Sequence, residues 1–382
     1  MIKNNNTYCR MPFVGFQSAH GGCRLCCGAS GPDRSKPVSG KEFWNSEYLS
    51  EVRKKMEKGD RVQACQKCYD EEAHGKLSLR NHYNSRYKNL DTMETPTALD
   101  LDFSNLCNLQ CIMCGPDRSS QWSKELGNKE VLSISKEKLD SICKMSHNLR
   151  HLTIQGGEPS LMPEFEYYFG YLKDNNLIQD IEIDCISNLT NVNNKFYQLL
   201  EDFKTVDLNA SIDSFGPANN YIRYPSDFEK IEENLIKLTE KNIQVNLQIT
   251  LQTLCMFNFY DFLTWISNMQ DKFKQNGKEL GLNLSYVTGH QYLEIQNAPK
   301  KLKQKMLDDI SKFTKTQKIR NNLKFALGLK NLEKILTTPQ KHDYINELKS
   351  YINTIDTRRA IKVTNYIPEF YNYLSMSKDT DE

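Results

Sequence analysis

Residues 102–116 read DFSNLCNLQCIMCGP and bring three cysteines, Cys107, Cys111 and Cys114, into one short loop. A zinc knuckle would offer paired cysteines and four ligands, and this loop offers neither. Three close thiolates suit a cubic iron–sulfur cluster in which protein binds three irons and the fourth is open. A zinc site, or a cluster closed by a distant cysteine, is the alternative that the spacing allows.

The cysteines of the chain are concentrated near its amino terminus, where nine of the twelve lie in the first third. The opening residues 1–13, MIKNNNTYCRMPF, lack the apolar core of a signal peptide, which indicates a reducing cytoplasm. In such a compartment, clustered cysteines are more often metal or cluster ligands than disulfides. The isolated Cys143 and Cys185 lie in apolar contexts and are expected to be small core side chains.

The length and charge of the chain limit its function classes. A chain of 382 residues predicts two to three domains, or one barrel-sized domain with additions. Lys and Arg number 50 and Asp and Glu 48, so a net charge of +2 gives no strong field for nucleic acid. No apolar run approaches the ~18 residues of a membrane span. We therefore expect neither a membrane nor a nucleic-acid partner.

Short β-branched or alternating runs recur along the chain, with amphipathic helical stretches between them. Repeated strand–helix alternation predicts a parallel sheet with right-handed crossovers. Six such units rather than eight predict an α/β fold, an open, partial (β/α)6 barrel with its chemistry beyond the carboxyl ends of the strands. The expected strands are 98–103, 151–155, 180–186, 206–212, 243–251 and 281–287.

Polar residues follow several of these strands in succession. The second strand ends in Gly156-Gly157-Glu158, where paired glycines allow backbone to approach a ligand closely. Any one such end is compatible with an ordinary turn, but their succession after a cysteine loop indicates a site. The ends of the third, fourth and fifth strands carry Ser187-Asn188, Ser211-Ile212-Asp213 and Cys255.

The CxxxCxxC spacing of Cys107, Cys111 and Cys114 resembles the signature of the radical S-adenosylmethionine (radical SAM) enzymes. In that family the amine and carboxylate of S-adenosylmethionine chelate the open iron of a [4Fe–4S] cluster. One electron from the cluster then cleaves the sulfonium to methionine and a 5′-deoxyadenosyl radical. The resemblance implies an enzyme that abstracts a hydrogen atom from a substrate, with a flavodoxin- or ferredoxin-like protein as external one-electron reductant.

The resemblance also implies residues that bind S-adenosylmethionine. Gly156-Gly157-Glu158 looks like the family's GGE motif, which holds the amino group of this cofactor through a carboxylate. Met113 stands where the family uses backbone atoms to meet adenine. Arg223 fits a carboxylate clamp, and a surface or substrate-facing arginine is its alternative. The positions that match ribose- and carboxylate-binding residues are Ser187, Asn188, Ser211 and Asp213.

A separate cysteine set precedes the first barrel strand. Residues 9–28 predict a hairpin whose return strand ends in Cys26-Cys27. A second pair, Cys65 and Cys68, opens a long helical run. On spacing alone, zinc explains four cysteines here as well as iron does.

For this set the resemblance favours iron, because the stretch resembles the twitch domain, a half-sized relative of the SPASM domain with an auxiliary [4Fe–4S] cluster. It implies the ligands Cys9, Cys26, Cys65 and Cys68. Cys27 stays open as the alternative to Cys26, and we expect only one of the two to ligate, because pleat alternation turns neighbouring side chains to opposite faces. The matching pieces are Cys9 with Pro12-Phe13, the Gly21 turn, Phe43-Trp44-Asn45-Ser46, Arg53 and Cys65-x-x-Cys68-Tyr69.

The expected organisation is a twitch domain over 1–92, a radical SAM barrel over 93–298 and a helical region over 299–382. Many SPASM and twitch enzymes carry the auxiliary domain after the barrel, whereas the order here resembles a subgroup of twitch-domain radical SAM proteins. In the last region basic and acidic residues alternate, which predicts solvated helix faces packed on the barrel.

The substrate stays open between a small molecule and a peptide. One alternative is a maturase or epimerase that acts on a ribosomally made precursor peptide, although no precursor-binding segment is recognisable before Cys9. A zinc-dependent binding or scaffold protein is the alternative from a different class. Cys255 is a candidate hydrogen-atom donor, as in some radical SAM epimerases, and a packed small hydrophobe is the other reading of it.

Overall fold

The computed structural model describes residues 7–30, 39–73, 77–316, 323–339 and 342–375. The chain forms two compact units, each assembled from several segments. The first comprises Met1–Leu106, Glu130–Ile186 and Asn193–Asp207. The second comprises Cys107–Lys129, Ser187–Val192 and Leu208–Glu382.

The strands belong to an eight-stranded sheet with the order β2-β1-β3-β4-β5-β6-β7-β8. Strands β3 to β8 lie within two residues of their predicted positions, which confirms the α/β class and the parallel sheet. The bounds are β1 Gly15–Ala19, β2 Gly22–Arg24, β3 Ala98–Asp102, β4 His151–Gln155, β5 Glu182–Ser187, β6 Thr205–Ser211, β7 Gln244–Leu251 and β8 Leu280–Tyr286.

The amino-terminal hairpin is confirmed, with β1 and β2 antiparallel, but its details differ from the prediction. Residues Met11–Val14 form the short helix α1, because Pro12 in its first turn presets a helical φ. Strand β2 ends at Arg24, so Cys26 and Cys27 follow the strand and pleat alternation does not separate them. In addition, β1 pairs in parallel with β3, which places the hairpin in the sheet.

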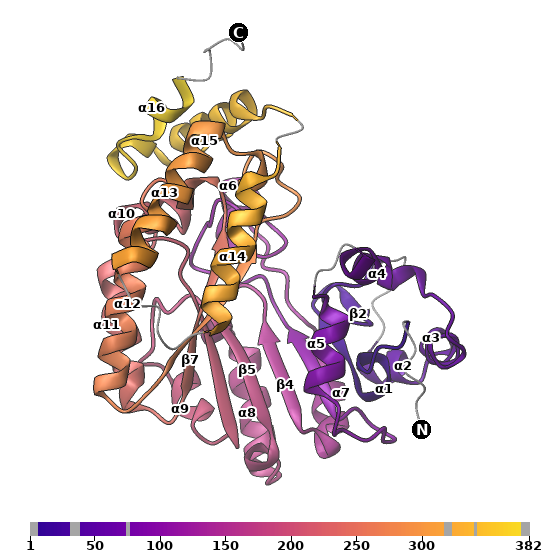
Figure 1. The fold of residues 1–382 in the computed structure, drawn as a ribbon. Coiled ribbons are helices and arrows are strands. Elements are labelled where there is room, and N and C mark those ends of the chain that lie inside the picture. The colour runs from indigo at the N-terminus through magenta and orange to yellow at the C-terminus, as the bar shows by residue number, and fades with distance from the viewer. Residues whose placement is uncertain (1–6, 31–38, 74–76, 317–322, 340–341, 376–382) are drawn as a thin grey trace. The chain divides into compact units, whose positions relative to one another are not determined.

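Eight helices of the described residues belong to the first unit, and in Figure 1 α2 to α5 gather around the hairpin. The long helical run predicted after Cys65 is two helices, because the Ser78 hydroxyl caps a second start by accepting from Asn81 N. The bounds are α1 Met11–Val14, α2 Gly40–Trp44, α3 Glu47–Lys58, α4 Gln66–Ala73, α5 Leu79–Arg86, α7 Lys136–Met145, α8 Pro163–Asp174 and α9 Lys195–Leu200.

In the second unit, β7 pairs in parallel with β8, and α12, α13 and α14 pack in succession (Figure 1). Across the described segments, no helix combines the length and apolar character needed to cross a bilayer. The bounds are α6 Ser120–Glu125, α10 Pro217–Ile222, α11 Phe228–Lys237, α12 Phe259–Gln275, α13 Lys300–Thr316, α14 Leu323–Thr337, α15 Ile345–Arg359 and α16 Phe370–Ser375.

The core forms where alternate strand residues and helix faces turn away from solvent. In β5, Ile183 and Cys185 are buried, and Cys143 is buried on α7. These positions confirm that Cys143 and Cys185 are small core side chains, as their apolar contexts predicted. Candidate ligands must therefore come from the other cysteines.

Candidate functional site

The loop Cys107–Cys114 lies in the second unit and is held by hydrogen bonds to its backbone. Ile112 N donates to Ile222 O at 2.9 Å, at the end of α10. From α6, Trp122 Nε1 donates to Cys111 O at 2.9 Å. These two hydrogen bonds hold the backbone of the cysteine loop in place.

The three thiols of this loop differ in their exposure to solvent. Cys107 is buried, and Cys111 and Cys114 are partly exposed. Leu109 N donates to Cys107 Sγ at 3.4 Å. Burial raises the pKa of Cys114 to about 11, while Arg223 opposes that rise. A bound metal would supply the positive charge that such thiolates require.

Arg223 and Asp213 form a buried ion pair in the same unit. Arg223 Nη1 lies 2.7 Å from Asp213 Oδ2, and Asp213 Oδ1 accepts from Thr250 N at 2.7 Å. Burial by itself lowers the pKa of Arg223, but Cys111 and Asp213 outweigh it and the pKa is raised. Arg223 Nε is buried with no hydrogen-bond partner among the described residues. This cation therefore has a donor left for an anionic group.

The amide of Asn188 connects the end of β5 to the cysteine loop. Asn188 Nδ2 donates to Asn108 Oδ1 at 2.9 Å, and Asn108 Nδ2 donates to Thr190 Oγ1 at 2.9 Å. Thr190 Oγ1 in turn donates to Asn188 Oδ1 at 2.7 Å. Asn108 and Thr190 were not among the predicted site residues, although Asn108 lies between two of the predicted cysteine ligands. The network fixes the loop against the residues that follow β5.

The Gly156-Gly157-Glu158 turn lies in the first unit, and its glycines are required by the fold itself. Gly156 has a φ of +130°, and a Cβ on Gly157 would lie 2.2 Å from Leu106 O. Glu158 N donates to Leu106 O at 2.7 Å, and the Glu158 carboxylate accepts from the Ser160 hydroxyl at 2.6 Å. The sequence predicted that the two glycines would allow backbone to approach a ligand closely. In the structure, the Gly157 backbone approaches the backbone of Leu106, the residue before Cys107.

The remaining predicted residues of this site lie at strand ends or beside the cysteines. Ser187 Oγ accepts from Leu189 N at 3.1 Å, and Ser211 is the last residue of β6. Met113 is half-buried in the cysteine loop. Cys255 lies in the 3-10 helix η7 (Thr253–Met256) and is wholly buried. Burial, and next Asp213, raise the pKa of Cys255, which favours its protonated form.

The amino-terminal cysteines Cys9, Cys26, Cys65 and Cys68 belong to the first unit. Burial raises the pKa of Cys9 to about 12, and the nearby Cys65 and Cys68 thiols add to the effect. Burial likewise raises the pKa of Cys26, with contributions from Cys27, Cys9 and Cys65. The four predicted ligands thus lie near enough to influence one another electrostatically.

Helix α5 positions the first of these cysteines through the backbone on either side of it. Asn84 Nδ2 donates to Tyr8 O at 3.0 Å, and Asn84 Oδ1 accepts from Arg10 N at 2.7 Å. Arg80 Nη1 also donates to Tyr8 O, at 2.8 Å. The Arg80 guanidinium acts to lower the pKa of Cys9. The spacing of the cysteines did not predict these roles of Arg80 and Asn84.

Cys27 and Cys23 have other partners. Cys27 Sγ lies 3.5 Å from the Tyr83 hydroxyl oxygen. Cys23, on β2, is buried, with its thiol 3.8 Å from Ser18 Oγ. The Tyr83 hydroxyl therefore lies beside Cys27, and the choice between Cys26 and Cys27 as a ligand stays a prediction.

In the parts of the chain that the structure describes, no three His, Cys, Asp or Glu side chains form a group that could hold a metal ion. The donor set of the Cys107–Cys114 loop fits an iron–sulfur cluster in its chemistry. It offers three thiols, a backbone N–H directed at Cys107 Sγ, and the unused Nε donor of Arg223.

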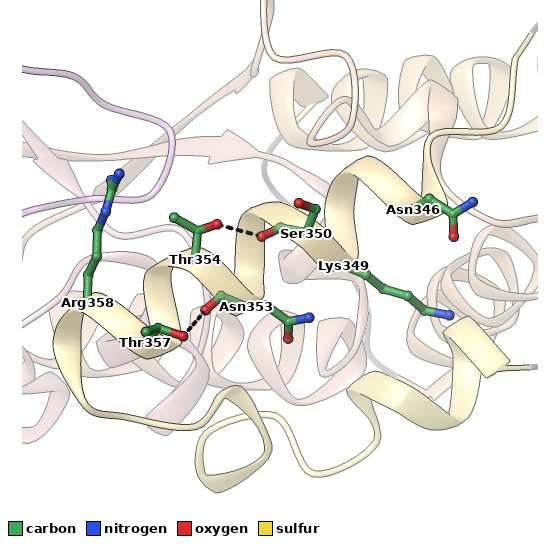
Figure 2. A pocket seen from close by; sticks show the side chains of 7 residues that line it. All are labelled: Asn346, Lys349, Ser350, Asn353, Thr354, Thr357 and Arg358. Carbon is green, nitrogen blue, oxygen red and sulfur yellow. Dashed lines mark hydrogen bonds between the residues drawn. The ribbon is translucent and has the colours of Figure 1, made fainter.

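A polar groove of about 640 Å³ lies elsewhere, on α15 (Figure 2). The Thr354 hydroxyl donates to Ser350 O and the Thr357 hydroxyl to Asn353 O, so these groups bond to their own helix. None of the predicted site residues lines this groove. Its lining residues are Asn346, Lys349, Ser350, Asn353, Thr354, Thr357 and Arg358.

One family model matches the part of the chain that contains the cysteine loop. The model of the radical SAM superfamily matches residues 101–261, a range that contains the loop, the Gly156-Gly157-Glu158 turn and Arg223. This match supports a radical SAM superfamily protein.

Individual relatives are distant. The sporulation killing factor maturation protein SkfB of Bacillus subtilis (strain 168) is 24% identical over 157 residues, which cover 41% of this chain and 36% of SkfB. Streptococcus suis SuiB bound to precursor peptide SuiA has a TM-score of 0.39 and 15% identity, covering 65% of this chain and 60% of SuiB. The methyltransferase TsrM from Kitasatospora setae has a TM-score of 0.37 and 12% identity, covering 50% of this chain and 37% of TsrM. The chain thus spans less than two thirds of each.

Proposed function

We propose that this chain is a radical SAM enzyme that reductively cleaves S-adenosylmethionine and abstracts a hydrogen atom from a substrate. The observation that carries the proposal is the fixed loop with Cys107, Cys111 and Cys114 inside the region that matches the superfamily. When bound, a [4Fe–4S] cluster and S-adenosylmethionine would supply the electron and the 5′-deoxyadenosyl radical.

The chain's own residues have distinct tasks in this proposal. Cys107, Cys111 and Cys114 would bind three irons of the cluster and would leave one iron open for S-adenosylmethionine. Arg223, held by Asp213, offers its Nε to the methionine carboxylate. By resemblance to the family, further contacts to the cofactor would come from Met113, Gly156, Gly157, Glu158, Ser187, Asn188 and Ser211.

A second cluster is part of the same proposal. Cys9, Cys26, Cys65 and Cys68 would bind an auxiliary [4Fe–4S] cluster in a twitch domain over 1–92. The mutual influence of their thiols supports this ligand set, and Arg80 supplies a compensating positive charge. Four ligands would close that cluster, so its role would be structural or electron transfer.

A precursor peptide is the substrate class we favour over a small molecule. The observation behind this choice is the similarity to SkfB, which is named as a maturation protein. The proposal includes a flavodoxin- or ferredoxin-like reductant and a reducing compartment, the cytoplasm, where free thiols persist. Cys255 is our candidate donor of the hydrogen atom that ends the reaction.

Metal content is the direct test of the cluster assignment. Anaerobically purified protein should be brown, should contain iron and sulfide, and should contain little zinc. Addition of S-adenosylmethionine should change the electron paramagnetic resonance (EPR) signal of the reduced protein. Colourless, zinc-loaded protein would contradict the proposal and favour a zinc-dependent scaffold.

A further inference from the structure

Arg359, the last residue of α15, is buried in the second unit, although its region was predicted to present solvated charges. Its side chain is 2% exposed, and its Nε donates to Glu125 Oε2 at 3.1 Å. Its guanidinium carbon lies 4.8 Å from the ring centre of Trp122 and 5.0 Å from that of Tyr224. Two aromatic rings and one carboxylate therefore hold this cation in place.

Both aromatic residues bond to the cysteine loop. Trp122 Nε1 donates to Cys111 O at 2.9 Å, and Tyr224 O accepts from Gln110 N. Arg359 thus contacts two residues, Trp122 and Tyr224, that each form a hydrogen bond with the backbone of the cysteine loop.

A second residue of α15 contacts the loop directly. The Tyr351 hydroxyl donates to Ile112 O, and the Tyr351 ring packs 5.0 Å from that of Tyr292. Helix α15 therefore touches the backbone of the loop as well as the residues that support it.

The Arg359 guanidinium has hydrogen-bonding capacity left. Its Nη1 and Nη2 are buried and have no hydrogen-bond partner among the described residues. A buried cation of this kind favours any nearby group that gains negative charge, because the low-dielectric surroundings screen it weakly.

We propose that Arg359 is a positioning residue for the catalytic cluster, and that its buried charge favours the reduced state of that cluster. The inference rests on the proposed function, in which Cys107, Cys111 and Cys114 bind the cluster. The reductant donates one electron, the cluster gains one negative charge, and no bond is made or broken. Helix α15 would then help to set the redox equilibrium of the cluster.

The test is a redox titration of the anaerobic holoenzyme, followed by the EPR signal that responds to S-adenosylmethionine. For Arg359→Gln, we expect on the order of a tenfold lower ratio of reduced to oxidised cluster at a fixed potential. For Glu125→Gln, which removes the opposing charge, we expect a higher ratio. Arg358→Gln is the matched control, because Arg358 is exposed on the same helix and should leave the ratio unchanged.

A shift of the same sign in Arg359→Gln and Glu125→Gln would overturn the proposal, as would equal shifts in Arg359→Gln and Arg358→Gln. If Arg359→Gln does not retain iron, the Glu125→Gln titration decides, and an unchanged or lower ratio overturns the proposal. Arg359→Lys keeps the charge and should stay within about twofold of the wild type. A purely steric role predicts that Lys and Gln behave alike.

Failure of this inference is distinguishable from failure of the proposed function. Wild-type protein that binds no iron would contradict the function itself. Normal cleavage of S-adenosylmethionine with unshifted titrations would contradict only the role of Arg359.

Discussion

Arg223 Nη1 lies 2.7 Å from Asp213 Oδ2, with side chains that are 11% and 0% exposed. A buried pair of this kind is costly to break from one side, because the remaining charge is left without a partner. It also ties the second residue after β6, Asp213, to the residue directly after α10, Arg223.

Breaking this pair should destabilise the protein non-additively. We expect Arg223→Met and Asp213→Asn each to cost about 3–5 kcal/mol of unfolding free energy, and the double variant to cost much less than their sum. Urea unfolding of the four proteins measures the coupling. The exposed pair Lys230–Glu233 is the control and should couple by less than about 1 kcal/mol. Additive costs at Arg223 and Asp213 would show that the pair is not coupled.

Asp100 predicts a pH dependence of stability. Burial raises its pKa to about 6, against about 3.9 in an unfolded chain. The folded state therefore binds this proton more tightly, and the stabilisation is present at low pH and lost as pH rises through about 6.

The corresponding variant is Asp100→Asn, which has no proton to lose. Between pH 5 and pH 8 the wild type should lose about 1 kcal/mol of unfolding free energy relative to this variant. Urea unfolding at both pH values measures the difference, with the exposed Asp180→Asn as control. Parallel pH profiles for wild type and Asp100→Asn would exclude the effect.

Iron content should distinguish Cys26 from Cys27. With two clusters per chain, Cys26→Ser should remove about half the iron, because it takes one ligand from the auxiliary set. Cys27→Ser should retain the iron, since the Cys27 thiol lies against the Tyr83 hydroxyl. Cys23→Ser is the buried-thiol control. Iron loss in Cys27→Ser with retention in Cys26→Ser would reverse the assignment.

The role of Cys255 is tested by the origin of the last hydrogen atom. If its thiol is the donor, Cys255→Ala should still form 5′-deoxyadenosine but return no product that carries solvent hydrogen. The measurement is deuterium incorporation from heavy water into product. Equal incorporation by wild type and variant would leave Cys255 as a packed core residue, which its complete burial also fits.

The strands were predictable because their signal is local. In β3 and β7, the runs of alternating or β-branched residues are sufficient to mark each element and its approximate ends. The parallel pairing of β1 with β3 was missed, because the two segments lie far apart in sequence and neither pattern names its partner. The end of β2 at Arg24 was also missed, and pleat alternation does not apply to Cys26 and Cys27, because both residues follow the strand.

The candidate site shows a similar division. Cys107, Cys111 and Cys114 were found because the three lie within one short loop. Arg359 lies 234 positions from its partner Glu125, so only the folded chain reveals it beside the loop. The spacing of cysteines in the sequence therefore predicts candidate ligands. The residues that support the loop are recognised only from their burial and ring contacts in the folded chain.

The most direct test of the central claim is cleavage of S-adenosylmethionine by the anaerobic, reduced protein, with and without its loop cysteines. The account predicts that wild type releases methionine and 5′-deoxyadenosine. It predicts that a variant with Cys107, Cys111 and Cys114 all changed to Ala releases neither and loses about half of its iron. Cleavage that persists in the triple variant would contradict the account.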